Sequence, residues 1–97
     1  MNRYFLTKLA TRDLKKIYEF IESRDLDTAL DIVTHLQLMC ESLAKMPQMG
    51  RKRDGYRKGL RSFLVDDYII FYRLVGSDIQ IVRVLHSAQD SKRIFSK

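Results

Sequence analysis

Residues 59–90 read GLRSFLVDDYIIFYRLVGSDIQIVRVLHSAQD, and this stretch decides the fold. It is rich in β-branched and aromatic residues, the composition that a pleated, half-buried surface favours. Gly76 and Ser77 separate its two most apolar runs and predict a type II′ hairpin turn, which needs a positive φ at its first central residue. The stretch therefore predicts three consecutive antiparallel strands, over residues 59–65, 68–75 and 78–86.

A two-residue turn also predicts the pairing of the last two strands, since turn length fixes hairpin register. On one face we expect these pairs: Leu74 with Ile79, Tyr72 with Ile81, Ile70 with Arg83, and Tyr68 with Leu85. On the other face we expect Arg73 with Gln80, Phe71 with Val82, and Ile69 with Val84. Both faces are apolar near the middle of the hairpin. The chain's own helices can cover one of them, so the other needs a terminal segment or a partner.

The first half of the chain supplies those helices. A short strand is expected over residues 3–6, and Thr7 is a suitable N-cap for a helix that runs to about residue 22. Asp27 is the next predicted N-cap, for a second helix that runs to about Lys45 and is stopped by Pro47. The order β-α-α-β-β-β predicts one α+β domain over residues 1–97, with an antiparallel sheet of three to four strands packed on an N-terminal helical hairpin.

Charge is distributed unevenly along the 97 residues. The net charge is +6, and residues 1–48 hold seven basic and seven acidic residues, so the excess lies in the second half. Such asymmetry predicts an acidic partner, either nucleic acid or an acidic protein segment; the alternative is a solvated surface. The single cysteine, the absence of a long apolar run and a first stretch unlike a signal peptide predict a cytoplasmic protein.

Much of the excess charge lies in one predicted loop at the edge of the sheet. Between positions 51 and 61 the chain carries six basic residues: Arg51, Lys52, Arg53, Arg57, Lys58 and Arg61. The four arginines are the first candidates for contact with a partner, because guanidinium forks match carboxylates and phosphates. Arg73 and His86 join them as candidates in the strands.

Arg83 lies in the middle of an apolar strand, where an unpaired charge is costly. Two interpretations remain open. An acid such as Asp13, Asp31 or Asp67 neutralises it within the fold, or a carboxylate or phosphate of a partner does so.

The sequence offers few residues for catalysis. Its two histidines, His35 and His86, have no ligand at metal-binding spacing, and no phosphate-binding loop is present, so neither metal nor cofactor is predicted. Cys40 falls on the apolar stripe of the second helix and is interpreted as a buried hydrophobe. Metal-independent RNA cleavage would need an acid or base, for which His86 is the candidate, together with cations around the phosphate. The apolar centre of both sheet faces favours a non-enzymatic, protein-binding function instead.

The complete pattern resembles ParE-type toxins of bacterial type II toxin–antitoxin modules, within the RelE/ParE superfamily. Residues 59–90 are similar to the family's "G-x-R-x-F-x-V-x-x-Y-x-I-x-Y-R" and "I-x-I-x-R-V-L-H-x-x-x-D" patterns. Residues 7–14 are similar to its opening "A-x-x-D-L" helix, and residues 46–51 to its "F-P-x-M-G-R" helix exit. The resemblance extends over essentially the whole chain.

This resemblance implies a RelE/ParE-like fold and a toxin that a cognate antitoxin neutralises with an acidic C-terminal segment, forming a hetero-oligomer. ParE-like members are associated with inhibition of DNA gyrase, and RelE-like members with cleavage of mRNA on the ribosome. Where the RelE branch carries catalytic Arg and Tyr residues, this chain has Ile69, Ser87, Ala88 and Phe95, which favours the ParE branch. Departures from the ParE pattern are Tyr18, where many members have Trp, and Gln89, where Arg is frequent.

Overall fold

The structure, a computed structural model that describes residues 2–96, is built on a five-stranded sheet with strand order β1-β5-β4-β3-β2. Its strands are β1 (Tyr4–Leu6), β2 (Arg51–Lys52), β3 (Leu60–Val65), β4 (Tyr68–Val75) and β5 (Asp78–His86). Neighbours are antiparallel, except that β1 runs parallel to β5. The predicted α+β class is confirmed. The prediction of three to four strands is wrong, because the basic loop contributes β2 as a fifth.

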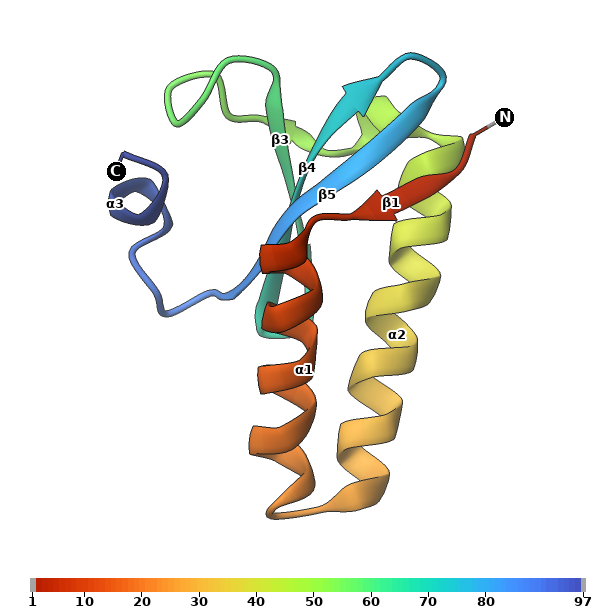
Figure 1. The fold of residues 1–97 in the computed structure, drawn as a ribbon, viewed down its shortest axis with the longest axis vertical. Coiled ribbons are helices and arrows are strands. Elements are labelled where there is room, and N and C mark those ends of the chain that lie inside the picture. The colour runs from red at the N-terminus through yellow and green to blue at the C-terminus, as the bar shows by residue number, and fades with distance from the viewer. Residues whose placement is uncertain (1, 97) are drawn as a thin grey trace.

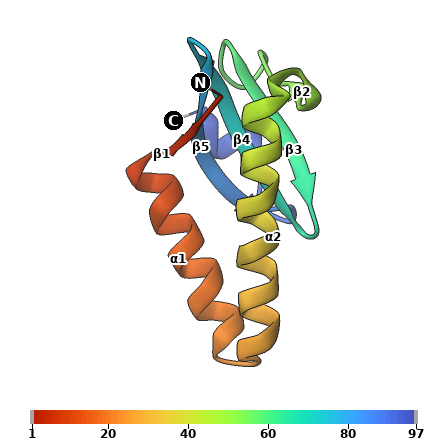
Figure 2. The ribbon, with the colours of Figure 1, turned by 90° about the vertical axis from the view of Figure 1, so that its right-hand side faces the viewer.

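Two long helices form the predicted hairpin, α1 (Lys8–Glu22) and α2 (Leu26–Lys45), and they cover one face of the sheet (Figures 1 and 2). Thr7 caps α1 as predicted, accepting a 3.0 Å hydrogen bond from the Ala10 N–H. The predicted N-cap of α2, Asp27, is wrong. Asp25 has the extended backbone of a cap and accepts from the N–H groups of Asp27 and Thr28. None of the helices in residues 2–96 is long and apolar enough to cross a membrane.

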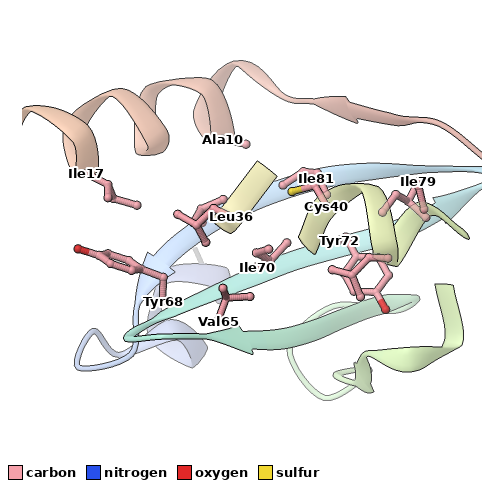
Figure 3. Packing of buried hydrophobic residues seen from close by; sticks show 13 residues of the cluster. Ala10, Ile17, Leu36, Cys40, Val65, Tyr68, Ile70, Tyr72, Ile79 and Ile81 are labelled. Carbon is pink, nitrogen blue, oxygen red and sulfur yellow. The ribbon is translucent and has the colours of Figure 1, made fainter. Parts of the chain in front are cut away.

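The main core lies between the helical hairpin and the sheet (Figure 3). Ile17 and Leu36 face it from the helices, and Ile70 and Ile81 face it from the central strands. Cys40 is 3% exposed in this cluster, so the interpretation as a buried hydrophobe is confirmed. Burial raises the pKa of its thiol to about 12, with a further contribution from the negative charge of Glu41.

The opposite face of the sheet is covered in part by the chain itself. A five-residue helix, α3 (Ser91–Phe95), lies against it on the side away from α2, as Figures 1 and 2 show together. Its Phe95 packs 4.8 Å from Phe71, centroid to centroid, and Tyr56 of the basic loop packs on both rings. A terminal segment thus covers part of the second apolar face, and Leu64 on that face stays exposed. The predicted polar tail folds back as a helix, and its last residue, Lys97, lies outside the described residues.

The register of the central hairpin is confirmed near the turn and wrong beyond it. Gly76 has a φ of 63°, and the pairs Leu74–Ile79, Arg73–Gln80 and Tyr72–Ile81 form as predicted.

A β-bulge between Phe71 and Tyr72 then inserts an extra residue, Val82, into β5. The pairs beyond it are Phe71–Arg83, Ile70–Val84, Ile69–Leu85 and Tyr68–His86. The bulge turns Val84 into the main core, not onto the face of Val82 where we predicted it.

Candidate functional site

The basic segment forms a closed loop at the edge of the sheet. A short 3₁₀ turn, Pro47–Met49, ends the helical hairpin, and β2 follows directly. The Arg53 N–H donates to the Leu60 carbonyl at 2.7 Å, and Asp54 accepts from the Gly59 N–H at 2.8 Å. These bonds close residues 53–60 on themselves, so the arginines stand on a defined scaffold.

A buried tyrosine anchors this loop to the core. The Tyr72 hydroxyl donates to the Pro47 carbonyl at 2.6 Å and accepts from the Gly50 N–H at 2.8 Å. Arg61 links the loop to β3 as well, because its guanidinium donates to the carbonyls of Gly50 at 2.7 Å and Gln48 at 3.4 Å. Arg61 was predicted to contact a partner, but the structure gives it this role within the fold.

Beside the loop lies a surface groove of about 520 Å³ that combines apolar walls with two of the predicted arginines, Arg51 and Arg53. Leu64 is 62% exposed, so the apolar wall is available to a partner. The residues of this basic groove are Met49, Arg51, Arg53, Ser62, Phe63, Leu64, Ile69 and Ser87. An apolar floor with cationic groups above it suits a polypeptide with apolar and acidic side chains.

The two arginines of the basic groove differ in their burial and in the contacts that they make within the fold. Arg53 is half-buried; its Nε donates to the Ser62 hydroxyl at 2.8 Å, and its guanidinium lies 5.3 Å above the Tyr56 ring. Arg51 is exposed on β2, and within residues 2–96 its guanidinium forms no hydrogen bond or ion pair. Arg51 is therefore the more available of the two for an external carboxylate or phosphate.

The other predicted arginines do not line this groove. Arg57 lies 5.0 Å above the Phe95 ring and holds α3. Arg73 donates to the Gln80 side chain at 2.8 Å and is exposed.

Arg83 donates to Asp13 through Nε at 2.8 Å and through its second nitrogen at 3.0 Å, which confirms one of the acids predicted for it. Hydrogen bonding to Asp13 raises the pKa of Arg83. His86 lies with Arg83 in a separate small pocket and does not line the basic groove.

No cluster of three or more His, Cys, Asp or Glu side chains that could hold a metal ion occurs within residues 2–96. His35 instead contacts Asp66 at 2.9 Å and links α2 to the turn between β3 and β4.

Sequence comparison decides the family. The family model described as "ParE toxin of type II toxin-antitoxin system, parDE" matches residues 4–91. This chain belongs to the ParE toxin family. It is also 30% identical over 86 residues to Toxin ParE3 of Caulobacter vibrioides, covering 88% of this chain and 86% of the relative.

Solved structures support the fold of this ParE-family toxin. It is similar to a chain of the chromosomal ParDE toxin–antitoxin system from P. aeruginosa, with a TM-score of 0.75 and 23% identity, covering 87% of this chain and 94% of that one. It is also similar to a chain of the toxin–antitoxin complex RelBE2 from Mycobacterium tuberculosis, with a TM-score of 0.56 and 24% identity over 87% and 95% of the two chains. These matches confirm the RelE/ParE-like fold.

The sequence analysis did not identify Met49 and Leu64, two apolar residues that line the ParE toxin's basic groove. A signal for Leu64 was present. Leu60 and Ser62 alternate with the core-facing Phe63 and Val65, so Leu64 had to point away from the helices. Met49 gave no such signal, because the 3₁₀ turn that positions it has no apolar periodicity.

Proposed function

We propose that this ParE-family toxin binds and inhibits DNA gyrase in the cytoplasm, and that a cognate antitoxin neutralises it. The observation that carries the proposal is the basic groove, where the free Arg51 stands beside the exposed Leu64. Arg51 is suited to an ionic contact with another protein, and Leu64 is suited to an apolar one. The action is stoichiometric, and the chain is not an enzyme in this proposal.

The antitoxin contributes an acidic, extended C-terminal segment in this proposal, giving a hetero-oligomer. The sheet edge beside the basic groove supports this mode of binding. Within residues 2–96, β2 covers β3 only at Arg61 and Ser62, so the outer edge of β3 from Phe63 to Val65 has no neighbouring strand. An added strand there gains main-chain hydrogen bonds, while Arg51 and Arg53 meet its acidic side chains.

The decisive test is a supercoiling assay with purified gyrase and increasing amounts of toxin. We expect inhibition that follows the toxin-to-gyrase ratio. Arg51→Ala should weaken it about tenfold, the effect of one charge-assisted hydrogen bond. Lys52→Ala is the matched control, because Lys52 is the next residue of β2, is also exposed and points to the other side of the sheet.

Induction in cells separates this proposal from a RelE-like mRNA endonuclease. Gyrase inhibition gives an SOS response with intact transcripts. Cleavage of ribosome-bound mRNA, abolished by His86→Ala, would overturn the proposal. His86 does not line the groove that Arg51 and Arg53 line, which favours gyrase inhibition, since a ribonuclease needs its acid or base beside the cations that hold the phosphate.

A further inference from the structure

A second, smaller pocket of about 170 Å³ lies between α1 and the end of β5 and shares no lining residue with the basic groove. Six polar side chains line it: Asp13, Lys16, Tyr68, Arg83, His86 and Gln89. Nothing in the gyrase proposal uses this pocket.

Hydrogen bonds within the chain occupy three of the roughly four acceptor positions of the acid in the pocket. One Asp13 carboxylate oxygen accepts from Arg83 at 3.0 Å, and the other accepts from the Nε of Arg83 at 2.8 Å and from the Val84 N–H at 3.0 Å. This carboxylate covers the edge of β5 where β1 has ended, so its position serves the fold. It neutralises one positive charge of the pocket and offers little to a ligand.

The other acceptors are occupied in the same way. His86 Nδ1 accepts from the Ala88 N–H at 3.0 Å, which leaves Nε2 as the ring nitrogen that carries a proton. The Gln89 carbonyl oxygen accepts from the His86 N–H at 2.9 Å, which leaves its NH₂ group. Both side chains therefore present donors.

Donors also come from the remaining walls. Lys16 is exposed on α1, and the outer nitrogen of Arg83 that does not touch Asp13 forms no hydrogen bond within residues 2–96. Tyr68 packs edge-on against the His86 ring at 5.3 Å, and Figure 3 shows its hydroxyl beside Ile17, directed out of the core. The pocket thus combines five donor groups with no free carboxylate.

We propose that this pocket binds a phosphate group. Its charged groups are Lys16, Arg83 and Asp13, which sum to one positive charge, and His86 adds a donor at Nε2. A carboxylate has two oxygens and about four acceptor positions, whereas a phosphate offers three or more strongly accepting oxygens, which matches five donors better.

The test is a titration of the ¹⁵N-labelled protein with sodium phosphate, using sodium chloride at matched ionic strength as the control. We expect saturable shifts of the amide signals of His86, Ala88 and Gln89 in phosphate alone. Lys16→Ala should weaken binding about tenfold, and Lys15→Ala should change it less than about twofold. Lys15 is the matched control because it is exposed on the same helix but does not line the pocket.

Three outcomes would overturn the proposal: shifts that never saturate, equal losses in the two lysine variants, or equal affinity for sodium acetate, which would indicate a carboxylate site. A short DNA duplex distinguishes two sources of the phosphate. Binding to DNA that Lys16→Ala weakens and Lys15→Ala does not identifies a nucleic-acid backbone. Saturable phosphate binding with unchanged DNA affinity identifies a small phosphorylated ligand.

Discussion

Tyr72→Phe is the sharpest test of how the basic groove is held in place. The substitution keeps the ring in the core and removes only the hydroxyl, which bridges the Pro47 carbonyl and the Gly50 N–H. Burial is the main cause that raises the pKa of Tyr72, so this hydroxyl stays protonated at neutral pH and keeps donating to Pro47. Its loss leaves both backbone groups without their partner.

The expected cost follows from the burial of those two groups. Gly50 is buried, and an unsatisfied buried N–H costs about 1–3 kcal/mol. The Pro47 carbonyl belongs to a half-buried residue and can turn to water, so its contribution is smaller. We expect a loss of about 2 kcal/mol in the free energy of unfolding, and a fall in Tm of about 8–16 °C for a domain of this size.

Equilibrium unfolding in urea, followed by circular dichroism, measures this loss. Tyr4→Phe is the control, because the hydroxyl of the half-buried Tyr4 forms no hydrogen bond within residues 2–96. Gly50→Ala tests the same contact from the other side. A Cβ there would lie 2.2 Å from the Tyr72 hydroxyl oxygen, and the fully buried ring cannot retreat, so a cost at least as large is expected. If Tyr72→Phe costs less than about 0.5 kcal/mol, as a surface change does, the hydroxyl is not the anchor.

Three further predictions concern other parts of the fold. Arg83→Met leaves the Asp13 carboxylate, whose side chain is 11% exposed, without its cation. The free energy of unfolding in urea should fall by about 2 kcal/mol, less than at a fully buried ion pair. An unchanged urea midpoint would contradict this. Ser91→Ala removes a buried hydroxyl that has no hydrogen-bond partner within residues 2–96, and it should be neutral or stabilising by up to about 1 kcal/mol. Ser62→Ala removes an acceptor that an arginine uses and should destabilise, so the reverse order of midpoints would refute the assignment. Cys40, with its pKa raised to about 12, should resist a disulfide reagent at pH 8 until the protein is unfolded, and rapid labelling of the native protein would show that its helix opens.

The sequence was sufficient for the parts of the fold that depend on neighbouring residues. The Gly76 turn, the capping of α1 by Thr7 and the stop at Pro47 are local, and each was predicted from residue type and spacing. The register near the turn followed for the same reason, since a two-residue turn leaves no other pairing.

Distant contacts explain what the sequence could not predict. The bulge at Val82 lies where Arg83 reaches Asp13, seventy residues earlier in the chain, and local patterning carries no sign of that contact. The strand β2 has only two residues, both charged, so it lacks the alternation by which strands are found. The helix α3 presents only Ile94 and Phe95 as apolar residues, too few for a helical period.

The same limit applies to the site. Charge density located the basic segment, but it could not separate arginines that hold the fold from arginines that face outward. Arg61 ties backbone carbonyls and Arg57 holds a phenylalanine ring, so replacing either would disturb the scaffold together with any contact. Arg51 makes no such contact within residues 2–96. Its loss therefore reports on partner binding alone, and Arg51→Ala tests the proposed function more cleanly than a change at any other arginine of the segment.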